Sequence, residues 1–244
     1  MHDRLAIARW TNEGGYVPSE NGEPGRHAHA PRPVEAPGTS TAPLRGEAPG
    51  QQDRGVEPTT VGGPLRIWSV GHSTHSLADF LALLAAHGIE VVADIRSVPK
   101  SRRHPQFHID ALAASLPEHG LLYRHLPQLG GLRSPRRNST NDAWRNRSFR
   151  GYADYALTIE FAAGLSALRR IAENAPTAMM CAEALWWRCH RRLVADRLVA
   201  GGDTVLHIAS NGGSSAHELT SFARCNVNGT ITYVAGDPSE SGTR

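Results

Sequence analysis

Short apolar runs of strand length alternate with longer segments of helical period along most of the chain. The first run, residues 65–70, is followed by a segment that begins at Ser76 and spaces its leucines as one helix face, and then by a second run, residues 89–93. A strand, a helix and a strand within about thirty residues form a βαβ unit, with parallel strands and a right-handed crossover. The opening part of the pattern therefore predicts a parallel sheet.

The same alternation continues to about residue 224. It predicts helices over residues 109–119, 152–173, 192–200 and 217–223, strands over residues 121–125, 177–180 and 204–208, and a hairpin turn at Asn228 and Gly229. We therefore expect an α/β fold: a single domain over residues 65–224, with a mostly parallel sheet of about five strands flanked by helices.

The two ends of the chain differ from this pattern. Residues 1–64 contain nine of the sixteen prolines and no apolar period. Such a segment cannot bury enough apolar surface to offset the entropy lost on ordering. We expect a disordered Pro/Gly-rich leader over residues 1–64 and a C-terminal tail over residues 225–244.

Charge and cysteine content narrow the class of protein. The net charge of +3 and the isoelectric point near 9.0 permit an acidic partner without requiring one. An odd number of cysteines, three, without a signal peptide favours a reducing compartment, so we expect a cytoplasmic protein. No apolar stretch approaches the roughly 18 residues of a membrane span, so we expect no membrane partner.

Polar residues follow the predicted strands at the points where the strands end. They are His72 and Ser73 after the first strand, Asp94 and Arg96 after the second, and Cys181 and Glu183 after the fourth. Ligands of open parallel sheets bind at the carboxyl ends of the strands. We expect these side chains to line one pocket.

The start of a helix adds a site for negative charge. Cys189, His190 and Arg191 open the helix that follows the fourth strand, and helix N-termini favour anions and cysteine thiolates. Arg96 and Arg188 add positive charge nearby. A small anionic or nucleotide-like ligand is the expected partner, and nothing in the sequence identifies a cofactor.

Seven short motifs occur in a characteristic order. They are Gly71-His72-Ser73, Asp94-Ile95-Arg96 with Pro99 and Ser101, Leu129-Gly130-Gly131, Gly151-Tyr152, Cys181-Ala182-Glu183, Cys189-His190-Arg191 and His207-Ile208. In this order, over residues 66–220 approximately, the chain resembles the domain-of-unknown-function 488 family. The resemblance implies a compact α/β domain in a prokaryotic intracellular protein, and it implies no reaction.

The site residues allow several chemistries, and we expect a hydrolase or a transferase. The catalytic candidates are Asp94, Cys181, Glu183, Cys189 and His190; the candidates for ligand binding are His72, Ser73, Arg96, Ser101, Arg188 and Arg191. A cysteine nucleophile with a histidine base is one interpretation, and acid–base catalysis by the two carboxylates is another. The opposing interpretation makes Cys181 a buried apolar residue and Asp94 the partner of an arginine.

Cys181, Cys189 and His190, with Glu183 or His72, have side chains that bind zinc, but the sequence argues against a metal site. The spacing of Cys181 and Cys189 differs from the close pairs of structural zinc sites. Cys189 and His190 are adjacent, so on a helix their side chains are expected to diverge.

The alternative function is non-catalytic binding of a nucleic acid or nucleotide. Residues 133–150 contain six arginines against one acidic residue, with Trp144, Phe149 and Tyr152 in or beside the segment. Arginines bind phosphates and aromatic rings stack on bases, so this predicted loop would be the binding surface.

Overall fold

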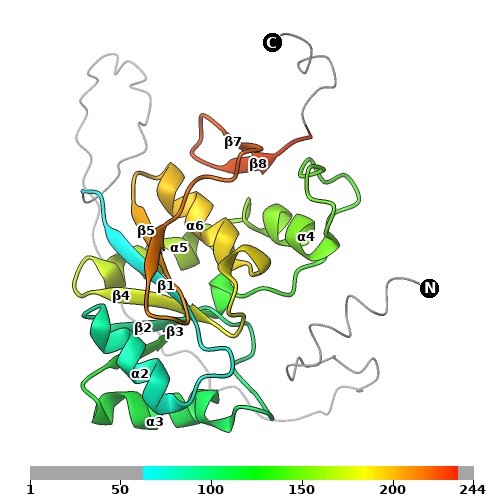
Figure 1. Cartoon of the computed structure of the whole chain (residues 1–244). Helices are drawn as coiled ribbons and strands as arrows, with labels where there is room; N and C mark the ends of the chain where they lie inside the picture. Colours follow the sequence, from blue (N-terminus) through cyan, green and yellow to red (C-terminus); the bar gives the residue numbers. More distant parts are fainter. Residues whose placement is uncertain (1–62, 236–244) are drawn as a thin grey trace, which may run out of the picture. The chain divides into compact units, whose positions relative to one another are not determined.

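A six-stranded sheet forms the centre of the domain. The computed structural model describes residues 63–235, and the strand order is β3-β2-β4-β1-β5-β6 (Figure 1). The five parallel strands are β1 (Arg66–Gly71), β2 (Val91–Asp94), β3 (Leu122–His125), β4 (Thr177–Cys181) and β5 (Thr204–Ile208). The short β6 (Ser214–Ala216) pairs antiparallel with β5. The predicted α/β class and mostly parallel sheet are confirmed.

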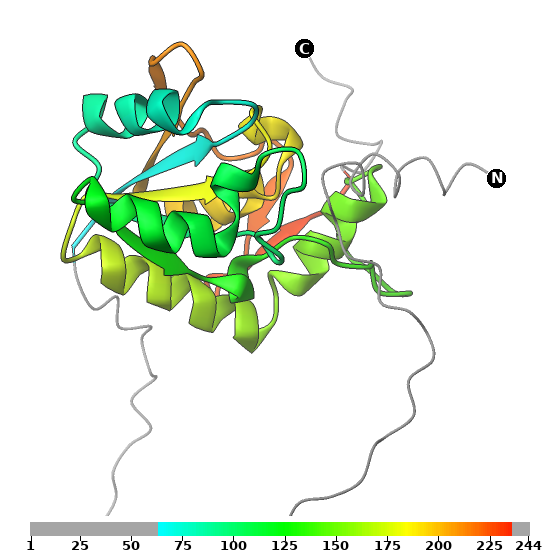
Figure 2. The same ribbon diagram turned by 90° about the horizontal axis from the view of Figure 1, so that it is seen from below.

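Helices cover both faces of the sheet. α2 (Leu77–Ala86) and α3 (Ile109–Glu118) pack on one face, while α4 (Arg147–Tyr155), α5 (Ile159–Ala172) and α6 (Arg191–Ala200) pack on the other (Figures 1 and 2). In the central strand β4, Met179 faces the cluster under α5 and α6, and Ala178 and Met180 face the cluster under α2 and α3. Because both faces of β4 are covered, all five of its residues are buried, and four of the five are apolar, which explains the continuous apolar run in its sequence.

Predicted helix boundaries hold where a capping residue is present. The Ser76 hydroxyl accepts a hydrogen bond from the backbone N–H of Asp79 at 3.1 Å, which starts α2. Gly88 and Gly120 follow α2 and α3 with φ of +63° and +73°, a conformation that glycine adopts without steric strain.

The single helix predicted over residues 152–173 is wrong, because it is two helices. α4 ends at Tyr155, and the Thr158 hydroxyl caps α5 by accepting from the N–H of Phe161 at 3.3 Å. α4 also starts earlier than expected, since the side chain of Asn146 caps its N-terminus. Thr158 is a polar residue within an apolar pattern, and Asn146 lies in the arginine-rich segment before it, so the helical period alone reveals neither cap.

The helix predicted over residues 217–223 does not exist. His217 and Thr220 instead direct hydrogen bonds to the buried Asp196 of α6, at 2.9 Å from His217 Nε2 and 2.8 Å from the Thr220 backbone N–H. The expected hairpin is present: β7 (Ala223–Cys225) pairs with β8 (Ile231–Tyr233), with Gly229 at φ +74° in the turn.

The expectations for the chain ends fall mostly outside the described residues. Of the leader, residues 1–62 are not described, and neither are residues 236–244 of the tail. Within residues 63–235, no helix combines the length and the apolar character that crossing a membrane requires.

Candidate functional site

A cavity of about 230 Å³ opens at the carboxyl ends of the parallel strands. Nine of the eleven predicted site residues line it: His72, Ser73, Arg96, Ser101, Cys181, Glu183, Arg188, Cys189 and His190. Asp94 and Arg191 are not among the lining residues and are fully buried. The expected pocket is therefore present at the expected edge of the sheet.

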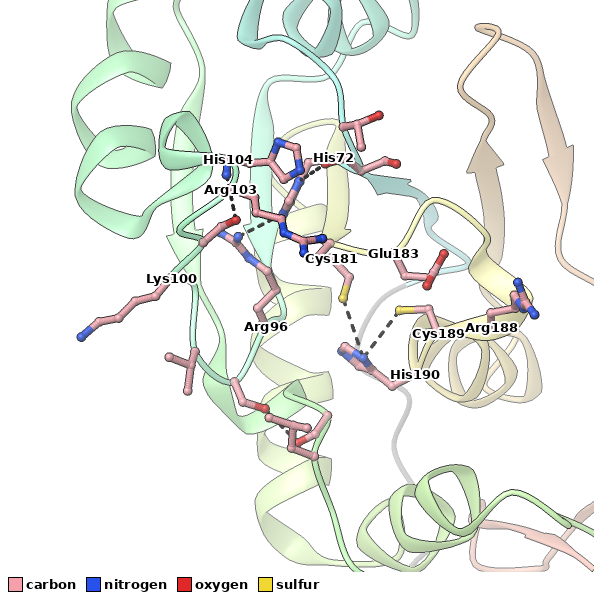
Figure 3. A pocket seen from close by; sticks show the side chains of 18 residues that line it. His72, Arg96, Lys100, Arg103, His104, Cys181, Glu183, Arg188, Cys189 and His190 are labelled. Atoms are coloured by element: carbon pink, nitrogen blue, oxygen red, sulfur yellow. Dashed lines mark hydrogen bonds between the residues drawn. The ribbon is translucent and has the colours of Figure 1, made fainter. Parts of the chain in front are cut away.

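Two thiols and one imidazole converge in the cavity wall. Cys181 ends β4, Cys189 follows the short 3-10 helix η3 (Trp186–Arg188), and His190 is the N-cap of α6. His190 Nδ1 lies 3.9 Å from the Cys181 sulfur and 3.6 Å from the Cys189 sulfur (Figure 3). All three side chains are almost completely buried, so they form the inner end of the cavity.

The hydrogen bond of His190 Nε2 fixes the tautomer of the ring and so the atom that faces the thiols. His190 Nε2 lies 3.0 Å from the backbone carbonyl oxygen of Ile95, which can only accept, so Nε2 carries the hydrogen and donates. The free lone pair is then on Nδ1, directed at both sulfurs. This imidazole can accept a proton from a thiol or bind a metal ion.

The expectation that the side chains of Cys189 and His190 diverge is wrong. Cys189 has extended backbone angles, with φ −122° and ψ 154°, while His190 has helical angles, with φ −60° and ψ −17°. Since the two residues are not both within a helix, the change of backbone conformation between them brings both side chains to the same point. The three ligand atoms lie within 4.8 Å of one another.

The two thiols differ in how easily they ionise. Burial raises the pKa of Cys189, but the hydrogen bond with Cys181 and the electrostatic interactions with His190 and Arg191 oppose burial and bring the pKa well below its usual value. The hydrogen bond with Cys189 and burial raise the pKa of Cys181. Cys189 is thus the favoured thiolate, with the Cys181 thiol as its donor.

Arg191 lies behind the cavity wall and holds the loop between the two cysteines. Its Nη2 donates to the backbone carbonyls of Glu183 and Ala184, the latter at 3.3 Å, and its Nη1 donates to the Ser69 hydroxyl. Among the described residues no salt bridge involves Glu183, whose carboxylate accepts from the N–H of Leu185 at 3.3 Å. Within residues 63–235, the Glu183 carboxylate therefore lines the cavity without a salt bridge to an arginine.

Asp94 is the ion-pair partner of Arg96, as expected from the interpretation that gives Asp94 a structural role and not a catalytic one. It accepts from Arg96 Nε at 2.9 Å, from Arg96 Nη2 at 2.5 Å and from the Tyr123 hydroxyl at 2.7 Å. Asp94 thus fixes the guanidinium of Arg96, which reaches the cavity while Asp94 does not.

His72 completes the arrangement around Arg96. Its Nδ1–H donates to the Ser73 carbonyl at 3.0 Å, so its Nε2 accepts from Arg96 Nη1 at 3.2 Å. Burial and the charge of Arg96 lower the pKa of His72 to about 3, which keeps the ring neutral. These bonds leave one hydrogen on Arg96 Nη1 for a ligand.

Sequence reasoning missed part of the wall. Lys100, Arg103 and His104, from the basic loop after β2, also line the cavity, as does Leu132. The run of basic residues indicated the first three, but whether their side chains point into the cavity depends on the fold.

Two residues of the wall have a strained backbone. Ser73 and Leu132 have φ of +45° and +60°, and no other non-glycine residue in the described chain has positive φ. Such backbone strain concentrates at functional sites.

The proposed nucleic-acid surface lacks its stacking residues. Trp144 and Tyr152 are buried, and Phe149 stacks on Trp144 with ring centroids 4.8 Å apart. Buried Asp154 ties down the segment by accepting from the Ser139 hydroxyl at 2.6 Å and from the Asn141 side chain at 2.8 Å. Of the three rings that were expected to stack on bases, two are therefore buried in the protein, and the third, Phe149, is partly buried against Trp144.

Comparison with known proteins gives one match. A family model described as a domain of unknown function, DUF488, matches residues 76–198. Neither the curated proteins nor the solved structures contain a match to the chain. The matched segment includes Cys181, Cys189 and His190 and most of the other residues of the cavity wall, so most of the cavity lies in the matched region.

Proposed function

We propose that this chain, which belongs to the domain of unknown function DUF488 family, is a hydrolase or transferase that acts on a small anion in the cavity. One observation carries the proposal: a thiolate-forming cluster of two cysteines and a histidine opens into the same cavity as several cationic side chains. The three free cysteines are consistent with a reducing, cytoplasmic environment.

The cavity wall supports an anionic substrate. Arg96 is held in place by Asp94 and keeps one donor for a ligand, while Lys100 and Arg188 lie on opposite sides of the cluster (Figure 3). Charged donors form the strongest hydrogen bonds to phosphate and carboxylate oxygens. We assign anion binding to these three residues, with Ser73 and Ser101 as neutral donors.

The size of the cavity favours a small substrate. Its volume of about 230 Å³ lies below the ~300–1,000 Å³ that is usual for sites that enclose a drug-sized ligand. A compound that bears one phosphate or carboxylate group therefore fits better than a complete nucleotide. Glu183, the carboxylate on the wall, is assigned to proton transfer.

The full chain is tested on a panel of small phosphate esters and of carboxylic esters that carry a separate, ionised carboxylate group. We expect Cys189→Ala to lower kcat/KM at least ~100-fold, the scale of losing a group that takes part in proton transfer or attack. Cys225→Ala is the matched control, because Cys225 is an exposed free cysteine that does not line the cavity. Circular dichroism and Tm confirm that both variants fold. Full activity in folded Cys189→Ala would contradict the proposal.

A further inference from the structure

We infer that Cys181, Cys189 and His190 bind one zinc ion, with a fourth coordination position open to the cavity. The chemistry of this inference rests on the proposed function, whereas the metal site depends only on the positions of the three side chains. The zinc ion is the group that would activate the attacking water.

The spacing of the three atoms matches a tetrahedral zinc site. With Zn–S near 2.3 Å and Zn–N near 2.0–2.1 Å, two tetrahedral ligands place sulfur and nitrogen about 3.6 Å apart. The observed separations from His190 Nδ1 are 3.6 Å to Cys189 and 3.9 Å to Cys181, and all three atoms lie within 4.8 Å. The nitrogen–sulfur separations need to change by a few tenths of an ångström at most, and the sulfur–sulfur separation, which is within 4.8 Å, by about 1 Å at most to reach tetrahedral geometry.

The histidine is held as metal-bound histidines usually are. Its Nε2–H donates to the Ile95 carbonyl, which fixes the ring and directs the Nδ1 lone pair at the two sulfurs. A hydrogen bond of this kind on the second ring nitrogen sets the tautomer and makes the ligand nitrogen more basic. The imidazole is therefore oriented before any ion arrives.

The symmetry of the cluster favours an ion over a cysteine–histidine pair. A nucleophilic cysteine needs one thiol beside its base. Here two buried thiols lie at similar distances from one nitrogen, in a loop fixed by the bonds from Arg191 to the carbonyls of Glu183 and Ala184. One soft, tetrahedral ion accounts for both thiols, and sulfur with imidazole nitrogen is a ligand set that zinc prefers.

The open position connects the ion to the substrate. Three protein ligands plus a water is the arrangement of catalytic zinc, which lowers the pKa of the bound water. The water passes a proton to the Glu183 carboxylate, and the resulting hydroxide bonds to the phosphorus or carbonyl carbon of the anionic ester. The bond to the leaving alkoxide breaks, and the alkoxide takes the proton from Glu183. All three ligands and Glu183 line the cavity, as this step requires.

The site is tested by titrating the metal-free full chain with Co²⁺, a spectroscopic substitute for zinc. We expect one equivalent to bind, with the thiolate-to-cobalt charge-transfer band and the intense visible bands of a tetrahedral site. Cys189→Ala and His190→Ala should weaken binding at least ~100-fold, as the loss of a first ligand exceeds the 10–100-fold loss of an outer partner. Cys225→Ala should bind as the wild type does.

A second measurement uses the wild type, so it does not depend on whether a variant folds. Zinc should protect Cys181 and Cys189 from alkylation while exposed Cys225 reacts at an unchanged rate. Binding of less than a tenth of an equivalent of Co²⁺, or equal alkylation rates with and without zinc, would overturn the metal site. If Cys189→Ala still abolished turnover in that case, the enzyme would act by direct thiolate attack. Stoichiometric metal with no turnover of any anionic ester would keep the metal site and overturn the proposed function.

Discussion

At the scale of single residues, the protein keeps two buried histidines neutral. His72 stacks on Phe107 at 4.2 Å, and His207 stacks on Trp186 at 4.1 Å. The pKa of each is lowered to about 3, by burial in both cases, with Arg96 adding to the effect at His72 and His217 at His207. Protonation of either ring is therefore unfavourable as long as the ring stays buried and stacked in the folded protein.

These pKa values predict a specific dependence of stability on pH. Because the folded pKa lies below the unfolded value of 6.5, the unfolded chain binds protons first as the pH falls. The stability is therefore intact above pH 6.5 and is lost progressively toward pH 3, at up to ~1.4 kcal/mol per pH unit for each histidine. Between pH 6.5 and 5.0, we expect the free energy of unfolding to fall by about 3 kcal/mol, measured by chemical denaturation with a chelator present.

A variant identifies the groups responsible. His207→Asn removes one titrating ring and should halve this decline, whereas the exposed His119→Asn should leave it unchanged. An unaltered slope in His207→Asn would show that other groups carry the dependence.

The residues that line the cavity could be predicted to the extent that they follow strand ends. Cys181 and Glu183 were found in this way, since the carboxyl ends of parallel strands meet at one edge. Arg191 was assigned to the ligand, but it is fully buried and supports the loop instead. Burial of an arginine depends on the packing of elements distant in sequence, so the local pattern could not distinguish these roles.

At the scale of elements, the end of β1 is pressed against the loop that follows β4. A Cβ on Gly71 would overlap the carbonyl oxygen of Glu183 and lie 2.8 Å from its carbonyl carbon and 2.9 Å from Arg191 Nη2. Only glycine allows this close approach, which lets the carbonyl of Glu183 meet the guanidinium of Arg191.

The close approach predicts that Gly71→Ala is destabilising. Backbone atoms must shift, so we expect a loss of ~1–3 kcal/mol in the free energy of unfolding, together with faster alkylation of Cys181 and Cys189 as their loop loosens. Gly63→Ala is the matched control, because a Cβ at Gly63 meets nothing within 4 Å. Equal stability of the two variants would disprove the constraint.

The sequence predicted some elements better than others for physical reasons. Four of the five parallel strands, β1, β2, β4 and β5, are mostly buried, and β3 is partly exposed; all five were found because each is bounded by turns. β6 was missed because Ser214–Ala216 is short, fully exposed and without apolar alternation. The break between α4 and α5 was missed because a threonine cap interrupts a period that otherwise continues.

At the scale of the whole molecule, the C-terminal hairpin belongs to the folded core although it follows the family match. Tyr233 is buried, donates its hydroxyl to Asp196 at 2.8 Å, and its backbone N–H donates to the Asn141 side chain at 2.9 Å. These bonds connect β8 to α6 and to the segment before α4. A fragment cut at residue 198, where the match ends, would leave Asp196 without Tyr233, His217 and Thr220.

Removing one hydroxyl measures this connection. Tyr233→Phe takes a donor from a buried carboxylate, so we expect the free energy of unfolding to fall by ~1–3 kcal/mol. Tyr155→Phe is the control: its hydroxyl donates to the Gln128 carbonyl at 2.7 Å in an exposed position, and its loss should have little effect. Chemical denaturation gives both values, and a Tyr233→Phe variant as stable as the control would show that the hairpin is held by apolar packing alone.

The two edges of the sheet differ in what surrounds them. The cavity lies at the carboxyl edge, and the turns that lead into β2, β3 and β5 lie at the opposite edge, where a Cβ on Gly88, Gly120 or Gly202 would meet nothing within 4 Å. Insertions in those turns can lengthen or decorate the molecule without reaching the cluster. Relatives of this domain can therefore differ in length at one edge of the sheet while the cavity at the other edge keeps its side chains.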